Sequence, residues 1–206
     1  MDVMRFIEVE HKFIVNDEFD LTRFGLVLDG LGPTRRTELV VRDRYFLTEN
    51  GRARRYILRH RFDSEINQLT LKSLQADPET RDEISLNLGH HAGSQGAEVD
   101  AFVAQQEVVW SGTLVKDLKV WYFPDCEVVH YVAHTDAHQV RVVEFEATVK
   151  PSVGAALAIL ARYEQATGFD PSTRSMQSLV DLLFPGVFHS AGRDGYLDAM
   201  VRSSTR

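Results

Sequence analysis

The stretch Ile7-Glu8-Val9-Glu10-His11-Lys12-Phe13-Ile14-Val15 decides the fold of this chain of 206 residues. Side chains of a β-strand alternate between two faces, so Glu8, Glu10 and Lys12 share one face while most apolar residues of the stretch share the other. The apolar face predicts packing against a core. The charged face fits two environments: the solvated side of an ordinary antiparallel sheet, or the lumen of a barrel whose apolar faces lie outward beneath helices.

Charged residues recur at alternate positions in later strand-like segments, now with basic side chains among them. The residues that share such a face are Arg59 and Arg61, Lys72, Arg81 and Glu83, and Glu144 and Glu146. This repetition favours the barrel with a charged lumen over a solvated sheet. A lumen with clustered carboxylates and clustered Arg and Lys side chains suits an anion that arrives with its own divalent metal, and a polyphosphate is such an anion.

The composition predicts one globular domain with no basic character. Hydrophobic residues make up 44% and charged residues 26% of the sequence, and the net charge is −7. We expect a single domain over residues 1–185 and a tail over 186–206 that includes a short helix near 194–201. The negative charge argues against a general affinity for nucleic acid, which uses broad basic surfaces.

Other features bear on location. Cys126 is the single cysteine, so no internal disulfide can form. The sequence shows neither the apolar core of a signal peptide nor an apolar run long enough to span a bilayer. We therefore expect a cytoplasmic protein with no membrane partner and no nucleic-acid partner, and the oligomeric state stays open.

Periodicity and turn residues predict a mixed set of helices and strands. The predicted strands cover residues 7–15, 38–47, 54–62, 67–74, 81–88, 113–123, 127–133 and 139–149. The predicted helices cover residues 19–31, 98–109, 151–167 and 172–184, with Gly168 closing the third, a turn at Asn50-Gly51 and a loop over 89–96. This order is typical of an α+β fold with antiparallel β-structure.

Six segments, taken in order, resemble the motifs of the CYTH, or triphosphate tunnel metalloenzyme, superfamily. They are Glu8-Val9-Glu10-His11-Lys12 (ExExK), Arg42 to Thr48 (a DxYFDT-like segment), Leu58-Arg59-His60-Arg61 (LRxR), Leu69-Thr70-Leu71-Lys72 (TLK), Arg81-Asp82-Glu83 (RxE) and Glu144-Phe145-Glu146 (ExE). One such motif alone is weak evidence, but six in the expected order are specific. The resemblance covers roughly residues 4–185, and the segments 7–15 and 41–48 look most like thiamine-triphosphatase-type members.

The resemblance implies an eight-stranded antiparallel β-barrel, a tunnel with a charged lumen and helices packed outside. It also implies metal-dependent action on triphosphate compounds, with Mg²⁺ or Mn²⁺ as cofactor. These hard cations prefer oxygen ligands. The resemblance assigns the metal to Glu8, Glu10, Glu144 and Glu146.

The basic residues of the motifs would hold the phosphate chain. Arginine presents a planar fork to phosphate oxygens and lysine a compact point charge. The predicted substrate-binding residues are Lys12, Arg59, Arg61, Lys72, Arg81, Lys116 and Lys119. We expect water to attack the terminal phosphorus, with Glu144, Glu146 and Lys12 as catalytic residues and one of the two carboxylates orienting or deprotonating the water.

Two positions depart from the family pattern. Family members carry a KxR pair in the strand that corresponds to 115–121, whereas this chain has Lys116 and Lys119 with Leu118 at the usual Arg site. The strand before the last ExE motif usually contributes an Asp, and His130 lies near the expected place. Tyr45 fits either packing or the lumen, and Arg81 with Glu83 fits either phosphate binding or a structural pair.

Three functions remain open from the sequence. The first is hydrolysis of a triphosphate, whether thiamine triphosphate, inorganic triphosphate or a nucleoside triphosphate. The second is a tunnel that binds polyphosphate or nucleotide and has lost turnover through the changes at Leu118 and His130. The third is cyclisation of a nucleotide, as in class IV-type adenylate cyclases, although no base-recognition element is evident.

Overall fold

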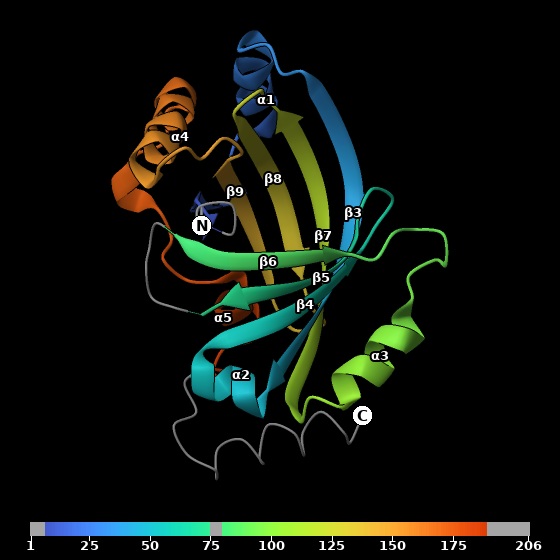
Figure 1. Ribbon diagram of the computed structural model, residues 1–206. Coiled ribbons are helices and arrows are strands. Elements are labelled where there is room, and N and C mark those ends of the chain that lie inside the picture. The colour runs from blue at the N-terminus through green and yellow to red at the C-terminus, as the bar shows by residue number, and fades with distance from the viewer. Residues whose placement is uncertain (1–6, 75–79, 189–206) are drawn as a thin grey trace.

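The computed structural model describes residues 7–74 and 80–188, and its strands wind into one antiparallel sheet that forms a nearly closed barrel (Figure 1). The order of the nine strands is β1-β6-β5-β4-β3-β7-β8-β9-β2. The strands are β1 (Ile7–Glu8), β2 (Glu10–Val15), β3 (Arg35–Thr48), β4 (Tyr56–Phe62), β5 (Asn67–Ser73), β6 (Arg81–Asn87), β7 (Val108–Tyr122), β8 (Cys126–His134) and β9 (Gln139–Ala147). The predicted antiparallel barrel is confirmed, with nine strands where eight were expected.

The additional strand arises from a break in the first predicted strand at Val9. β1 pairs with β6 and β2 pairs with β9, so consecutive residues join the two edges of the sheet. The Val9 carbonyl still accepts a hydrogen bond from the amide of Ala147 at 3.0 Å. The single strand predicted over residues 7–15 is therefore wrong in this detail, because one regular strand cannot follow both edges of a twisted sheet.

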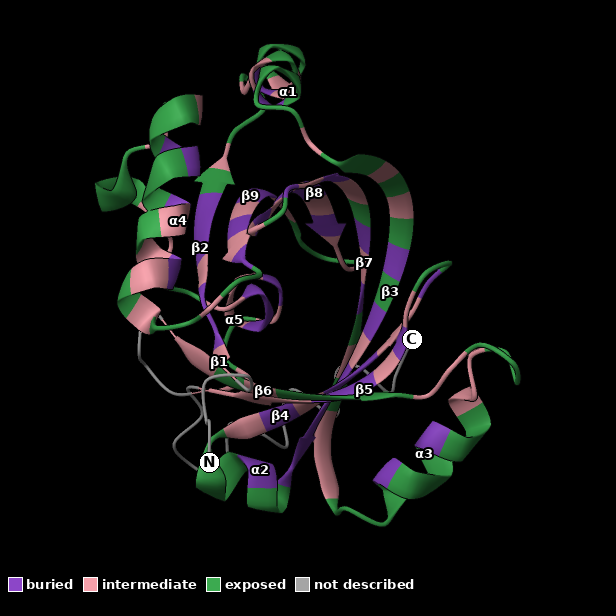
Figure 2. Cartoon of the chain, turned by 45° about the horizontal axis from the view of Figure 1, so that its top comes forward, coloured by how far each residue is buried: buried purple, intermediate pink, exposed green. Residues whose placement is uncertain are grey.

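Two helices pack on the outer face of β2, β8 and β9, and Figure 2 shows the second of them beside β2. They are α1 (Leu21–Gly30) and α4 (Val153–Thr167). Phe24 and Leu28 of α1 and Leu160 of α4 enter a buried apolar cluster that includes Phe13 and Phe145 of the strands. On the same face His11 contacts Glu164 of α4 through a side-chain hydrogen bond. The odd-numbered residues of β2 thus face the helices, as the alternation predicts.

The remaining helices lie at other places around the barrel. They are α2 (Glu49–Arg54), α3 (Gly96–Ala104), the 3₁₀ turn η2 (Pro171–Thr173) and α5 (Leu179–Leu183). Val99 and Val103 of α3 pack against Phe46 and Leu69. Helix α5 covers one end of the lumen, where its residues pack with Tyr131 and other lumenal apolar side chains (Figure 2). The lumen is therefore filled on the α5 side.

Several helix predictions need correction. The helix predicted over 98–109 ends at Ala104, because the chain turns there and enters β7 at Val108. The helix predicted over 172–184 is only η2 and α5, and the turn predicted at Asn50-Gly51 lies within α2. In the described residues, no helix is long and apolar enough to cross a membrane. The tail helix predicted near 194–201 lies outside the described residues.

Candidate active site

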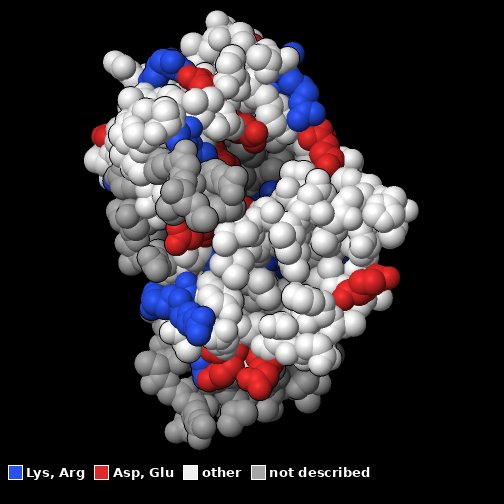
Figure 3. Space-filling model, viewed as in Figure 1, with Lys and Arg blue, Asp and Glu red and all other residues white. Residues whose placement is uncertain are grey.

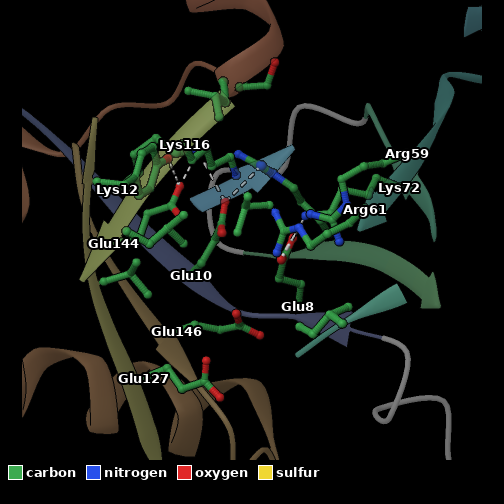
Figure 4. A pocket seen from close by; sticks show the side chains of 18 of the residues that line it. Glu8, Glu10, Lys12, Arg59, Arg61, Lys72, Lys116, Glu127, Glu144 and Glu146 are labelled. Carbon is green, nitrogen blue, oxygen red and sulfur yellow. Dashed lines mark hydrogen bonds and ion pairs between the residues drawn. The ribbon is translucent and has the colours of Figure 1, made fainter. Parts of the chain in front are cut away.

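Charged side chains from strands on every side of the barrel point into one pocket in the lumen (Figures 3 and 4). The basic residues that line it are Lys12, Arg59, Arg61, Lys72, Arg81 and Lys116. The acidic residues that line it include Glu8, Glu10, Glu127, Glu144 and Glu146. All sequence-predicted site residues except Lys119 are thus brought together, although they come from segments more than 130 positions apart.

The strand register explains how these residues meet. Glu10 pairs with Glu146 across β2 and β9, and Glu146 pairs with Glu127 across β9 and β8. One row of carboxylates therefore runs across three strands. Lys12 pairs with Glu144 in the next row. Directly paired residues share a face of the sheet, so all five side chains enter the lumen together.

Lysine and arginine side chains separate the carboxylates. The Lys72 ammonium lies 3.0 Å from a Glu8 oxygen and 2.8 Å from a Glu83 oxygen. Arg81 lies 3.0 Å from Glu10. Lys12 lies 3.4 Å from the same Glu10 oxygen and 3.2 Å from Glu144. The acidic and basic side chains thus form one network of ion pairs. An anionic ligand can bind there only if Lys or Arg side chains leave their glutamate partners.

A second buried cluster centres on Asp43, which is fully buried. Arg61 donates two hydrogen bonds of 2.7 Å to its carboxylate, and Lys116 lies 3.2 Å away. Burial alone would raise the pKa of Asp43, but Arg61 and Lys116 outweigh it and hold that pKa well below its ordinary value. Asp43 therefore carries a negative charge that fixes two phosphate-binding candidates in position.

Lys116 is the basic residue of the pocket lining whose pKa is lowered, whereas the pKa values of the other basic lining residues are raised. Burial lowers the pKa of its ammonium to about 8, since the nearby Arg61 also repels its charge and Asp43 compensates only in part. Its ammonium lies 5.1 Å from the centre of the Tyr131 ring. An anion in the lumen would stabilise the charged form of Lys116.

The carboxylates carry an excess of negative charge in one part of the lumen. Burial and then Glu10 raise the pKa of Glu8 to about 7, although Lys72 opposes them. Burial, Glu8 and Glu10 raise the pKa of Glu146 well above its ordinary value, and its nearest cation, Lys150, is 3.7 Å away. A raised carboxyl pKa means that the site favours a proton or another cation beside these oxygens.

The carboxylate oxygens of the pocket are therefore suitable ligands for a hard divalent cation, but the carboxylates lie too far apart for three of them to bind one ion together. Within residues 7–74 and 80–188, no three His, Cys, Asp or Glu side chains are placed close enough to hold a metal ion together. Mg²⁺ needs only one or two protein carboxylates when substrate phosphates and water complete its coordination. Glu10, Glu146 and Glu127 form the row that could supply them.

Two predicted placements differ from the structure. Lys119 lies on the outer face, where it pairs with Glu38 at 3.0 Å. His130 also lies outside the lumen, buried and stacked on Phe19 with ring centres 6.0 Å apart. The predicted lumenal positions of Lys119 and His130 are wrong, because alternation in β7 and β8 turns even positions of β7 and odd positions of β8 inward. Leu118 does line the lumen.

Sequence reasoning missed two lumenal residues. Glu127 lies three residues before His130 and points into the lumen, where His130 was expected to replace the family's acidic residue. Asp43 forms ion pairs with Arg61 and Lys116. Alternation counted back from Tyr131 would have found Glu127. Asp43 is the first acidic residue of the DxYFDT-like segment and shares a strand face with Tyr45, so alternation counted back from a lumenal Tyr45 would have found it.

The structure also places the three residues whose roles the sequence left open. Tyr45 is both buried in the apolar cluster around α5 and part of the pocket lining, and burial followed by Asp43 raises its pKa to about 12. Glu83 pairs with Arg59 at 3.2 Å as well as with Lys72, whereas Arg81 pairs with Glu10. Arg81 and Glu83 therefore belong to the lumenal network and do not pair with each other.

Comparison with known proteins supports the same architecture. Comparison with curated proteins gave no match. Among solved structures, the PH1012 protein of Pyrococcus horikoshii OT3 is 16% identical with a TM-score of 0.63, and the match covers 85% of this chain and 99% of that one. A conserved hypothetical protein of Pyrococcus furiosus is 20% identical with a TM-score of 0.61, over 85% of this chain and 99% of that one.

A third structure carries a functional name. It is a Vibrio parahaemolyticus protein provisionally named an adenylate cyclase, 14% identical with a TM-score of 0.60, over 85% of this chain and 97% of that one. At such identities these likenesses establish the fold alone. The family model of the CYTH domain matches residues 7–163, which is most of the sequence. The chain therefore belongs to the CYTH domain family.

Proposed function

We propose that this protein hydrolyses a triphosphate compound in its tunnel with the help of a divalent metal ion. One observation carries the proposal: six basic side chains from β2, β4, β5, β6 and β7 line the same pocket as a row of carboxylates. A single phosphate would engage only some of these six cations, which a ligand has to share with the carboxylates of the pocket. An extended triphosphate, with its several negative oxygens, matches both the number and the spread of the cations.

Substrate binding would proceed by exchange of partners within the network. Arg59, Lys72 and Arg81 each contact a glutamate that can be replaced by a phosphate oxygen. Arg61 and Lys116 keep their contacts with Asp43 and can still direct other hydrogens toward the ligand. As the cations turn to phosphate, Glu8 and Glu10 lose their partners and gain the freedom to bind a metal ion.

The metal would be held by Glu10, Glu146 and Glu127, with Glu8 and Glu144 beside them. Mg²⁺ or Mn²⁺ fits this all-oxygen donor set. When bound, such an ion neutralises phosphate charge and helps to align the reacting groups. Glu127 joins the predicted ligands Glu8, Glu10, Glu144 and Glu146 because it pairs directly with Glu146 in the β8–β9 ladder.

The protein groups around the terminal phosphate would perform the rest of the reaction. Phosphoryl transfer depends mostly on positioning and on stabilising charge, so fixed Lys and Arg side chains are the main requirement. A lumenal carboxylate, Glu146 or Glu144, would orient or deprotonate the attacking water. Glu144 is held by Lys12 and by the Tyr131 hydroxyl, which donates a 2.7 Å hydrogen bond, and so it positions Lys12.

Phosphate release from a substrate panel tests this proposal. The panel contains thiamine triphosphate, inorganic triphosphate and ATP, each with Mg²⁺, with Mn²⁺ and with a chelator. We expect metal-dependent release of orthophosphate from at least one compound, and a loss of at least a hundredfold in kcat/KM for Arg59→Met. Arg36→Met is the matched control, because Arg36 is exposed and pairs with Asp29 outside the lumen. Absence of phosphate release from all three compounds contradicts hydrolysis.

A second candidate function is binding without turnover. It draws on one observation, that within the described ranges no three acidic or histidine side chains are placed to hold a metal together. Titration calorimetry with inorganic triphosphate separates the two functions. Tight binding with no product would support the binding protein, whereas release of pyrophosphate from ATP would support the cyclisation reaction named for the Vibrio structure.

A further inference from the structure

One part of the lumen wall carries apolar side chains where the other walls carry charges. Leu39 of β3, Leu118 and Val120 of β7 and Val129 of β8 all line the pocket, and we call them the apolar strip. Leu39 pairs with Leu118, and Val120 pairs with Val129. These two pairs lie in neighbouring rows of the sheet, so the four side chains form one continuous surface.

The apolar strip adjoins the charged network directly. Lys116 lies two residues before Leu118 on the same face of β7. Glu144 pairs with Val129 in the β8–β9 ladder and also contacts Lys12. The apolar strip on the β7–β8 wall therefore borders two of the lysines proposed to hold the phosphate chain, Lys12 and Lys116.

The strip is open to the lumen at three of its four residues, while Val120 is buried. Leu39, Leu118 and Val129 remain only partly buried although they point into the barrel. At the α5 end, by contrast, the lumenal residues Tyr131 and Val142 are at most 1% exposed, because α5 packs on them. The strip thus offers apolar surface that the protein itself does not cover.

Polar partners for a ligand are scarce at the strip. The four aliphatic side chains donate and accept no hydrogen bonds. The next row of the wall holds Tyr122 and Glu127, and the Tyr122 hydroxyl already contacts Glu65 at 3.5 Å. A ribose placed here would give up hydrogen bonds with water and recover few of them, which costs binding free energy. An alkyl or other apolar group would gain from leaving water.

We propose that the apolar strip selects triphosphate monoesters whose organic group is apolar where it joins the phosphate chain, in preference to inorganic triphosphate and nucleoside triphosphates. This inference rests on the proposed triphosphatase function and narrows its substrate class. Inorganic triphosphate leaves the strip uncovered, and a nucleotide puts sugar hydroxyls on it. The strip therefore acts as the specificity-determining surface of the tunnel.

A comparison of kcat/KM across four compounds tests the inference. The compounds are n-butyl triphosphate and thiamine triphosphate, in which carbon chains follow the phosphate, and ATP and inorganic triphosphate. The butyl ester is uncharged beyond its phosphates, so it separates apolar contact from any attraction of the thiamine cation to the carboxylates. We expect n-butyl triphosphate and thiamine triphosphate, which present a carbon chain to the apolar strip, to exceed the other two compounds by roughly tenfold or more.

Two near-isosteric substitutions locate the effect. Val129→Thr puts a hydroxyl on the strip, and we expect it to lower the preference for n-butyl triphosphate over inorganic triphosphate by roughly threefold to tenfold. Val40→Thr is the matched control, because Val40 is 62% exposed on the outer face of β3 and should leave the preference unchanged. Leu118→Gln should act in the same direction as Val129→Thr.

The outcomes separate this inference from the function on which it rests. Faster cleavage of inorganic triphosphate or ATP than of both n-butyl triphosphate and thiamine triphosphate overturns the inference while the triphosphatase function stands. An equal effect of Val129→Thr on all four compounds also overturns it, since that result indicates a purely structural role. No release of phosphate from any compound removes the triphosphatase function and the inference with it.

Discussion

Glu127 of β8 lies directly opposite Glu146 of β9, and both carboxylates enter the lumen. Glu146 in turn lies opposite Glu10 of β2. Burial raises the pKa of Glu127, and Glu127 in turn contributes to the raised pKa of Glu146. Carboxylates placed side by side in this way disfavour one another's charge unless a cation lies between them, which is the basis of the first prediction.

Glu127→Gln should weaken metal dependence without disturbing the fold. The substitution keeps the shape of the side chain and removes one negative oxygen donor, so we expect activity to need roughly tenfold more Mn²⁺. The measurement is a titration of phosphate release against Mn²⁺ concentration. Asp117→Asn is the control, because Asp117 is exposed on the outer face. An unchanged Mn²⁺ requirement in Glu127→Gln would remove Glu127 from the proposed ligands.

Asp43→Asn should destabilise the protein strongly, and a bound triphosphate should restore part of the loss. Without the charge of Asp43, Arg61 and Lys116 stay buried and lack their shared anion, so the free energy of unfolding should fall by roughly 3 kcal/mol. Urea denaturation with and without inorganic triphosphate measures both effects. A loss of stability that inorganic triphosphate does not reduce would contradict the placement of phosphate beside these two cations.

The ionisation of Lys116 should limit activity at high pH. Its pKa is lowered to about 8 by burial, so the ammonium is present below pH 8 and is lost as the pH rises through that value. If the charge binds phosphate, kcat/KM should fall above about pH 8. In Lys116→Arg the charge persists to much higher pH, and the fall near pH 8 should disappear. The same fall in wild type and Lys116→Arg would assign it to another group.

Gly112 tests the packing at the α5 end of the barrel, and Gly154 in α4 serves as its control. A Cβ at Gly112 would lie 2.5 Å from the Trp110 ring and 2.9 Å from Phe184, so Gly112→Ala should lower the free energy of unfolding by about 2 kcal/mol. Gly154, within α4, has no atom within 4 Å of such a Cβ. Gly154→Ala should instead raise stability by about 0.5 to 1 kcal/mol. Equal melting temperatures of the two variants would contradict the tight packing at Gly112.

Much of the tunnel was predictable because alternation in a strand is a local property. The positions of Glu8, Glu10 and Lys12 on one face follow from the sequence of one strand, and the same holds for Arg59 with Arg61. The helix α4 was equally accessible, since Ser152 caps its first turn and Gly168 adopts a φ of 80° at its end. The alternation of side chains in a strand and the capping residues of a helix can both be predicted from the local sequence alone.

The wrong predictions concern features of the structure that depend on contacts between segments far apart in the sequence. Lys119 and His130 were assigned inward because the phase of alternation depends on the register between β7 and β8, which the sequence of either strand alone does not contain. The break at Val9 exists only because β1 meets β6 while β2 meets β9. The helix expected over 172–184 is replaced by the turn η2 and the short helix α5, since tertiary contacts bind the segment between them: the Ser175 amide donates to the Lys12 carbonyl at 2.6 Å.

Identification of the products by phosphorus NMR tests the central claim most directly. Purified protein with Mn²⁺ is incubated with inorganic triphosphate, thiamine triphosphate and ATP, alongside Lys72→Met and a chelated sample. The account predicts orthophosphate and the corresponding diphosphate from at least one compound, with both signals absent in the chelated sample and strongly reduced in Lys72→Met. Unchanged triphosphate signals in every sample, or pyrophosphate with cyclic nucleotide from ATP, would contradict it.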